Sequence, residues 1–305
     1  MRSLLASAVV LFVILTCSGC GGNSVHFNKS AVLFPVHADS QVVKIQVLPG
    51  SQGLAMQVGN RAELTYFNLS GVKTGSFLPD PAPDEVHAFY VWGPDSVILV
   101  SHNQLLGYGP HGTAHPISLA GVFGDVVMDD RHPIFSLTDR IYFLANNDRL
   151  AMVDLTMVYR YNFHKHTTDG LVAYPKRFSR PVGNPEIPVW KTDGSRLICA
   201  LPGQPQLLIY DLQNRTEQIV SLKVDSETAG LYYRAGSHEY FRLTRPDANN
   251  VFKLQLLKPD FSLAKEIVVS AEDYDPAQAF VAAGDIYLRQ QLGAAGEVAF
   301  DRIIF

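Results

Sequence analysis

The sequence predicts an all-β protein folded as a single β-propeller of six four-stranded blades. Long helical periodicity is rare, and short runs of Val, Ile, Leu, Tyr and Phe alternate instead with Gly, Pro, Asn and Asp. Several of these runs recur in a fixed order, and the repeated segment ends in a polar turn residue. The spacing between repeats, from about 41 to about 57 residues, is in the range of propeller blades.

The repeated segment is the third strand of each unit. It reads TYFNLSG, LGYGPHG, AMVDLTM, LIYDLQN, LLKPDFS and VAFDRII along the chain. We expect its polar residues to be structural, because Asp and Asn side chains at a strand end can bond the backbone that follows. These turn residues are Asn68, Gly109, Asp154, Asp211, Asp260 and Asp301.

The last unit offers only three strands, which predicts that another segment closes the ring. These strands are Ala279 to Ala283, Ile286 to Gln290 and Val298 to Ile304, whereas Val42 to Leu48 has no unit of its own. We expect Val42 to Leu48 to supply the outer strand of the last blade, since closure removes an exposed sheet edge. A β-sandwich or two smaller β domains are the alternatives. No linker-like change in composition divides the chain, so residues 40–305 are predicted to be one domain.

The N-terminus predicts export and lipidation. Arg2 precedes an apolar run, Leu4 to Thr16, that is short for a membrane span and typical of a signal peptide. The run ends in Cys17-Ser18-Gly19-Cys20, which resembles a bacterial lipobox except at Cys17, where Leu is commoner. We expect a signal peptide over residues 1–19, an acylated Cys20, and a tether over residues 20–39. An ordinary cleaved signal peptide is the alternative.

The predicted address is the cell envelope, with the chain held to a membrane through Cys20. Gly21 follows the cysteine in place of the Asp that commonly retains lipoproteins at the inner membrane, which favours the outer membrane. Together, the strand rhythm and the lipobox resemble the six-bladed β-propeller lipoproteins of bacteria, including the TolB-like group. That resemblance implies a membrane-anchored β-propeller, and a shared fold of this kind does not indicate a function.

Composition excludes some classes of function. Apolar residues make up 47% of the chain and charged residues 18%, which favours a packed core over disorder. A net charge of −4 without a basic run gives no support to nucleic-acid binding. Cys199 lies in an apolar run and is predicted to be a buried, inert thiol.

The connections from one blade's outer strand to the next blade's inner strand are the predicted binding face. Reading their charges predicts an acidic ring broken by a basic lobe in the longest connection. The connections are Leu78 to Val86, Gly121 to His132, His164 to Pro188, Lys223 to Gly230 and Ser270 to Gln278. The candidate ligand-binding residues on them are Asp84, Glu85, Asp129, Asp130, Arg131, His132, Lys176, Arg177, Asp273 and Asp275.

No catalytic or metal motif stands out. Asp129, Asp130 and His132 are the densest group of catalytically useful residue types, yet one contiguous run lacks the converging ligands that a metal needs. The histidines of His164-Lys165-His166 also lack the spacing of a zinc site. We therefore expect no cofactor, no metal and no catalytic residue.

Two functions remain open. The first is a monomeric binding or scaffold module that recruits a protein, peptide or glycan. The second is a polysaccharide hydrolase or lyase at the cell surface. Asp129 and Asp130 are the candidate carboxylates for that reaction.

Overall fold

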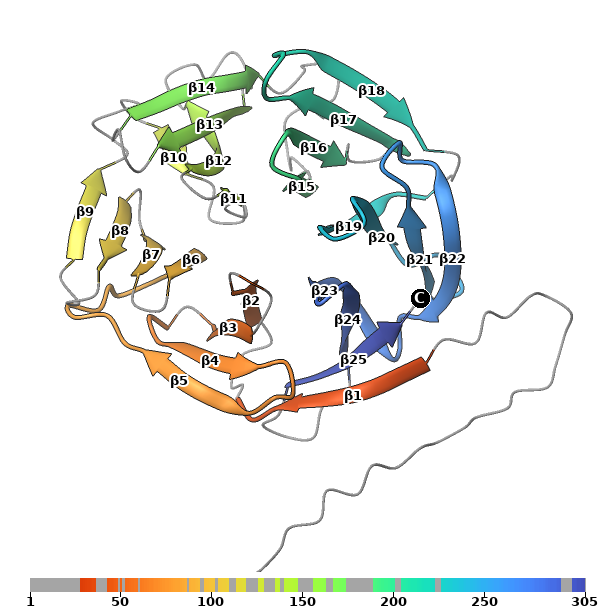
Figure 1. Cartoon of the computed structure of the whole chain (residues 1–305), viewed down its shortest axis with the longest axis horizontal. Coiled ribbons are helices and arrows are strands. Elements are labelled where there is room, and N and C mark those ends of the chain that lie inside the picture. The colour runs from red at the N-terminus through yellow and green to blue at the C-terminus, as the bar shows by residue number, and fades with distance from the viewer. Residues whose placement is uncertain are drawn as a thin grey trace, which may run out of the picture.

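The computed structural model describes most of the chain after residue 27. The described residues are 28–36, 43–48, 50, 53–59, 61–86, 88–93, 96–101, 104–109, 114–118, 126–128, 135–137, 140–147, 156–162, 167–173, 189–200, 204–222, 226–291 and 298–304. Antiparallel sheets arranged around a common axis make up this part of the chain (Figure 1). The predicted all-β propeller is therefore confirmed.

Four of the sheets consist of four strands that follow one another in sequence. The first two are β2 (Val43–Val47), β3 (Gly53–Val58), β4 (Leu64–Asn68) and β5 (Lys73–Phe77), then β6 (Ala88–Gly93), β7 (Ser96–Ser101), β8 (Gln104–Tyr108) and β9 (Ala114–Ser118). The other two are β15 (Val189–Thr192), β16 (Arg196–Ala200), β17 (Gln206–Asp211) and β18 (Glu217–Ser221), then β19 (Thr228–Arg234), β20 (Glu239–Thr244), β21 (Val251–Leu257) and β22 (Leu263–Ser270).

One sheet has five strands instead of the expected four. It consists of β10 (Val126–Met128), β11 (Phe135–Leu137), β12 (Arg140–Asn147), β13 (Thr156–Asn162) and β14 (Thr167–Ala173). Both β10 and β11 pair with β12. The predicted third strand of this unit was misplaced, because β13 begins at Thr156, beyond Asp154. Likewise β14 occupies part of the segment predicted as the connection from His164 to Pro188.

The ring closes with an N-terminal strand, but not with the predicted one. The last sheet has the order β1 (Asn28–Phe34), β25 (Val298–Ile304), β24 (Asp285–Gln290) and β23 (Tyr274–Ala282). Thus β1 is the outer strand of this blade, whereas Val43–Val47 is the innermost strand of the first sheet. The correction also places β1 inside the segment 20–39 that was predicted to be a tether. Val32 and Phe34 explain the choice, because both pack into the core between the last and first sheets.

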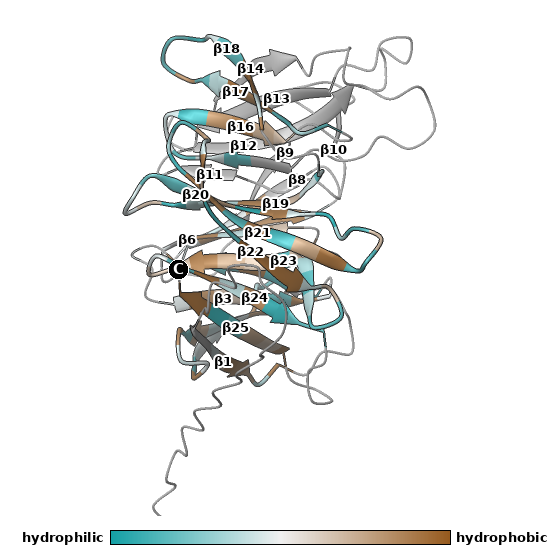
Figure 2. Ribbon diagram, turned by 90° about the vertical axis from the view of Figure 1, so that its right-hand side faces the viewer, coloured by the Kyte–Doolittle hydropathy of each residue, from teal (hydrophilic) through white to brown (hydrophobic). Residues whose placement is uncertain are grey.

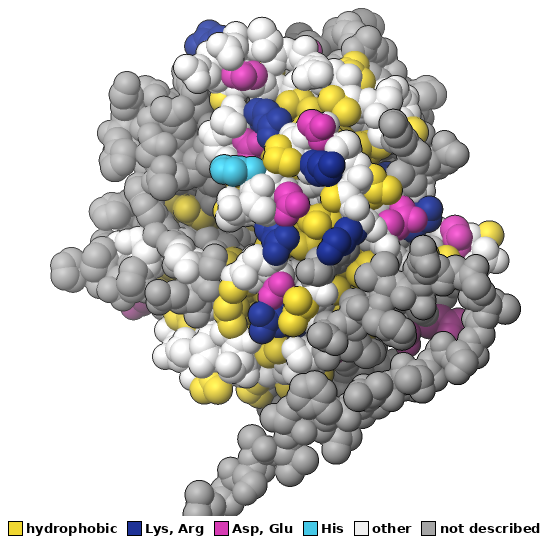
Figure 3. All heavy atoms as spheres, turned by 45° about the vertical axis from the view of Figure 1, so that its right-hand side comes forward, with side chains coloured by type: hydrophobic (Ala, Val, Ile, Leu, Met, Phe, Trp, Pro, Cys, Tyr) yellow, Lys and Arg dark blue, Asp and Glu magenta, His cyan; other side chains and the backbone are white. Residues whose placement is uncertain are grey.

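Apolar side chains fill the spaces between neighbouring sheets. One buried cluster joins the last sheet to the first, another joins the first to β6–β9, and two more lie on either side of β19–β22. Brown, hydrophobic stretches lie within several strands, whereas the coloured loops are mostly teal (Figure 2). On the face shown in Figure 3, acidic and basic side chains lie intermixed on the surface. Cys199 is fully buried on β16, as predicted, and burial raises the pKa of its thiol well above the usual value.

Three of the predicted turn residues bond the backbone that follows them. Asn68 accepts from the Ser70 and Val72 amides at 3.0 Å, Asp211 from Gln213 and Asn214 at 2.8 and 2.7 Å, and Asp260 from Ser262 at 3.0 Å. Asp301 was assigned wrongly, because it lies inside β25 and its buried carboxylate accepts a hydrogen bond from Tyr274.

Candidate functional site

The inner strands of the sheets meet around the axis of the ring (Figure 1). Strand β15 contacts β19, β19 contacts β23, β23 contacts β2, and β2 contacts β6. Two hydrogen bonds also join β2 to β6. The side-chain amide of Gln46 donates to the Val91 carbonyl at 2.9 Å and accepts from the Val91 N–H at 2.7 Å. Polar side chains on inner strands therefore converge here from different blades.

A bulge in β23 directs polar groups toward this region. Its pairing with β24 shifts between Asp275 and Ala279, and Pro276 lies in the interval. Proline cannot donate to a ladder of backbone hydrogen bonds, so a bulge is a natural place for it. The Asp275 carboxylate accepts from the Ala277 N–H at 2.9 Å, which fixes the bulged backbone. Within the bulge, Gln278 accepts a hydrogen bond from the Arg289 guanidinium.

Tyr232 on β19 connects this bulge to β15. A Cβ at Gly230 would lie 2.7 Å from Cε2 of Tyr232, so the absence of a side chain at Gly230 leaves room for the ring. The Lys191 ammonium of β15 lies over the same ring, 5.2 Å from its centroid. An ammonium over an aromatic face is attracted by the ring quadrupole. Three blades thus contribute to one group of partly buried residues, here named the axial cluster: Lys191, Tyr232, Asp275, Gln278 and Arg289.

Burial shifts the acid–base properties of the axial cluster. It lowers the pKa of Lys191 to about 8. It also lowers the pKa of Arg289, although the negative charge of Asp275 opposes that change. The pKa of Tyr232 rises, mainly by burial and further by Asp275, against a hydrogen bond from the Ala279 backbone. Near neutral pH both Lys191 and Arg289 therefore carry a positive charge.

Of the predicted ligand-binding residues that the structure describes, Asp275 alone lies in the axial cluster. Asp84 and Asp273 are exposed on their connections, and Glu85 is partly buried. The remaining predicted residues lie outside the described part of the chain: Asp129, Asp130, Arg131, His132, Lys176 and Arg177. The acidic ring expected on the connections therefore stays a prediction, and the axial cluster adds two basic side chains, Lys191 and Arg289, beside Asp275.

Sequence reasoning missed Lys191, Tyr232, Gln278 and Arg289. Lys191 and Tyr232 lie within strands and not on the connections that were read for charge. Arg289 lies on β24, and its side chain reaches Gln278 on the neighbouring inner strand β23. Pro276 could have indicated this site from the sequence, because a proline inside an otherwise regular strand suggests a bulge that redirects neighbouring side chains.

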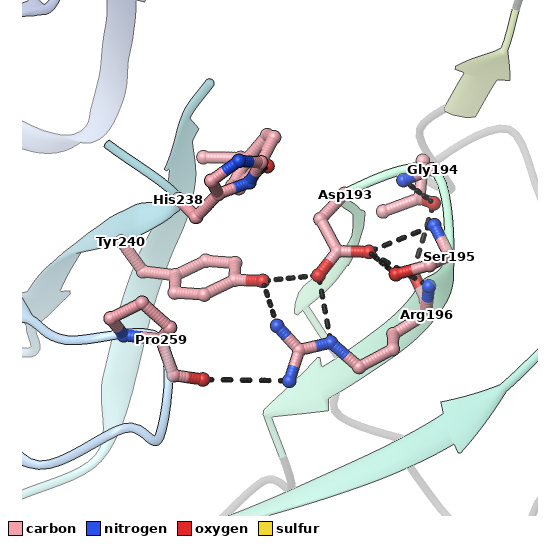
Figure 4. Close-up of polar contacts among 9 residues, drawn as sticks. Asp193, Gly194, Ser195, Arg196, His238, Tyr240 and Pro259 are labelled. Carbon is pink, nitrogen blue, oxygen red and sulfur yellow. Dashed lines mark hydrogen bonds and ion pairs between the residues drawn. The ribbon is translucent and has the colours of Figure 1, made fainter. Parts of the chain in front are cut away.

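A second group of hydrogen-bonded charged and polar residues lies between β15–β18 and β19–β22 (Figure 4). In the β15–β16 turn, Asp193 accepts from the Ser195 and Arg196 amides at 3.0 and 2.8 Å and from Nε of Arg196 at 2.8 Å. The hydroxyl of Tyr240, on the next sheet, donates to Oδ2 of Asp193 at 2.5 Å and accepts from Nη2 of Arg196 at 2.9 Å. We name Asp193, Arg196 and Tyr240 the interblade latch.

The interblade latch has the properties of a structural contact. Burial alone would raise the pKa of Asp193, but hydrogen bonds from Tyr240, Arg196 and the Ser195 backbone outweigh it and lower the pKa. The Arg196 guanidinium also lies over the Phe261 ring, 5.3 Å from its centroid, and Nη1 donates to the Pro259 carbonyl at 3.4 Å. Because these groups satisfy one another across two sheets, the latch holds neighbouring blades together.

Two classes of feature are missing from the described residues. They contain no group of three or more His, Cys, Asp or Glu side chains arranged to hold a metal ion. They also contain no helix of the length and hydrophobicity that a membrane crossing requires.

No family model matches the chain, and no curated protein matches its sequence. Among solved structures, a member of the DUF4221 family from Bacteroides vulgatus superimposes with a TM-score of 0.73 at 11% identity, covering 92% of this chain and 98% of that one. Virginiamycin B lyase from Staphylococcus aureus gives a TM-score of 0.54 at 12% identity, covering 92% and 100%. The calcium-binding protein regucalcin from Agrobacterium tumefaciens gives 0.50 at 12% identity, covering 89% and 92%. With these proteins the chain shares the β-propeller fold.

Proposed function

We propose that this protein is a membrane-tethered binding module that captures an acidic segment of a peptide or protein at the axial cluster. The observation that carries the proposal is the convergence of Lys191 and Arg289 with Tyr232 from three blades. Both cations are partly buried, and a low-dielectric surrounding strengthens their attraction for an anion. Tyr232 offers an amphipathic group beside them.

The arrangement supports binding more directly than hydrolysis. The alternative function, cleavage of a polysaccharide, uses a pair of carboxylates that flank the scissile bond. The axial cluster holds one carboxylate, Asp275, and one of its two oxygens accepts a hydrogen bond from the Ala277 amide. The basic members of the cluster match a ligand of opposite charge instead.

We further propose that the chain is tethered to a membrane and that its ring has six blades. Acylation of Cys20 would anchor the chain in the cell envelope, at the outer membrane in preference to the inner one. In the proposed ring, the five-stranded sheet β10–β14 is the sixth blade, placed between β6–β9 and β15–β18. A monomer of this kind would present the axial cluster beside a membrane.

Binding can be tested with short peptides of matched length. Fluorescence anisotropy would compare labelled hexaglutamate with labelled hexaglutamine and hexalysine. We expect measurable binding of hexaglutamate alone, weakened at least about fivefold by Lys191→Met, since a charge-assisted contact contributes roughly 1.5–3 kcal/mol. Lys265→Met, on the exposed outer strand β22, is the control because it removes the same charge away from the axis.

Two results would contradict binding of an acidic peptide at the axial cluster. Equal affinity for hexaglutamate and hexaglutamine would show that charge is not recognised. Equal weakening by Lys191→Met and Lys265→Met would show that net charge, and not the axial cluster, determines binding.

A further inference from the structure

A hollow of about 500 Å³ opens where β1 closes the ring. Its walls come from β1 and the β4–β5 turn, with Ala283, Tyr287 and Arg302 from the last sheet. Small-molecule sites generally fall between about 300 and 1,000 Å³. The hollow is therefore large enough for a compact ligand, and it lies between the last and the first sheets, away from the axial cluster.

One wall of the hollow carries a row of polar groups set by strand register. Arg302 on β25 pairs with Ser30 on β1 and with Tyr287 on β24. Residues paired across antiparallel strands present their side chains on the same face. Ser70, on the β4–β5 turn, lines the hollow from the opposite sheet. The hollow is thus lined by three hydroxyl-bearing residues, Ser30, Ser70 and Tyr287, together with Arg302.

Two donors in this row are unused within the described part of the chain. Tyr287 is 2% exposed, yet its hydroxyl makes no hydrogen bond with any described residue. Its ring stacks on Phe280, with centroids 4.6 Å apart, so its direction is fixed by packing. Arg302 uses Nε and Nη2 for Asp285, at 2.8 and 2.5 Å, and Nη1 makes no bond to a described residue.

We propose that this hollow binds a neutral saccharide unit. The Arg302–Asp285 ion pair brings one positive and one negative charge, so the wall has no net charge to select an ion. Serine and tyrosine hydroxyls both donate and accept, and that capacity complements the hydroxyls of a sugar ring. The unused Tyr287 hydroxyl and Arg302 Nη1 supply two fixed donors. Val32, Leu69 and Ala283 offer apolar contacts for the C–H face of the ring.

The test uses monosaccharides and saturation-transfer difference NMR on the full folded chain. Probes are D-glucose, D-galactose and N-acetyl-D-glucosamine, with D-glucuronate as the charged comparison. We expect at least one neutral sugar to bind, and Tyr287→Phe to weaken it about fivefold, the typical effect of one lost hydrogen bond. The ring and its stacking remain in Tyr287→Phe, so the variant should fold normally. Tyr210→Phe is the matched control, because Tyr210 is buried on β17, far from the hollow.

Each outcome decides the proposal. Neutral-sugar binding that is reduced by Tyr287→Phe and by Ser70→Ala, but not by Tyr210→Phe or Lys191→Met, supports it. Absence of neutral-sugar binding, binding of D-glucuronate alone, or equal affinity in Tyr287→Phe would overturn it. Lys191→Met alters only the axial cluster, so the failure of one site is distinguishable from the failure of the other.

Discussion

The Tyr240 hydroxyl donates a hydrogen bond to the Asp193 carboxylate across the boundary between two sheets, at 2.5 Å. The Asp193 side chain is only 4% exposed, so water cannot replace a lost donor. Tyr240→Phe should therefore lower the free energy of unfolding by about 1–3 kcal/mol, the cost of leaving a buried acceptor short of a partner. Urea unfolding measures it. Tyr210→Phe should cost less, because the Tyr210 hydroxyl makes no hydrogen bond to another described residue, and an equal loss in both variants would contradict a specific contribution from the latch.

The same contact predicts a pH dependence. Because the folded-state pKa of Asp193 is lowered, its contribution to stability is present above the unfolded-state pKa and is lost as pH falls through the folded-state pKa. The difference in unfolding free energy between wild type and Asp193→Asn should shrink as pH falls from about 6 to about 3. Asp273→Asn, at an exposed position, is the control. A difference that stays constant over this range would contradict the prediction.

Ligand binding at Lys191 should weaken as pH rises, whereas the stability contributed by Asp193 is lost as pH falls. With a pKa of about 8, its ammonium loses a proton where an ordinary lysine does not. Affinity for hexaglutamate should fall as pH rises from about 7 to about 9, and Lys191→Arg should remain flat because a guanidinium stays charged. Anisotropy titrations at constant ionic strength measure both. A parallel decline in the two proteins would exclude Lys191 as the titrating group.

Gly230 predicts a packing effect at the axial cluster. A methyl group there would meet Tyr232 Cε2 at 2.7 Å, so Gly230→Ala must displace the ring from beneath Lys191. We expect a loss of about 1–3 kcal/mol in unfolding free energy from overpacking, together with weaker hexaglutamate binding. Gly236→Ala is the control, because nothing lies within 4 Å of its Cβ position. Equal behaviour of the two variants would contradict the assigned contact.

The close approach of Gly71 to Leu33 should help to hold β1 in place. A Cβ at Gly71 would lie 2.0 Å from the Leu33 carbonyl oxygen, and its φ of +82° already disfavours a side chain. Gly71→Ala should loosen β1, which hydrogen exchange of residues 28–34 would detect as faster exchange. Gly75→Ala is the control, since its Cβ would meet Tyr66 at an ordinary 3.6 Å. Unchanged exchange in Gly71→Ala would show that the turn does not hold the strand.

The sequence allowed the repeating strands to be predicted because their determinants are local. Asn68, Asp211 and Asp260 each bond the backbone within four residues, and such turns can be recognised from residue type and spacing. Asp301 has the same residue type but lies inside a strand, where a distant partner, Tyr274, satisfies it. Residue type alone does not separate these two environments.

The candidate sites were less predictable because they depend on contacts between distant segments. Val42 to Leu48 and Asn28 to Phe34 are both apolar strands near the N-terminus, and their places follow from which neighbours they pack against. The axial cluster likewise depends on a register shift in β23 that aligns Gln278 with Arg289. The charge pattern of the connections predicted exposed acidic residues as the binding site, whereas the basic side chains of the axial cluster are partly buried.

The place of β1 has a mechanical consequence. Asn28 is paired with Ile304, so the end of β1 nearest the predicted lipid anchor is also the end of its ladder with β25. A pull on the N-terminus directed across the strands, away from β25, would therefore open that ladder from the Asn28–Ile304 pair, one residue pair at a time. In an anchored protein the closing strand would be the first element to yield under tension.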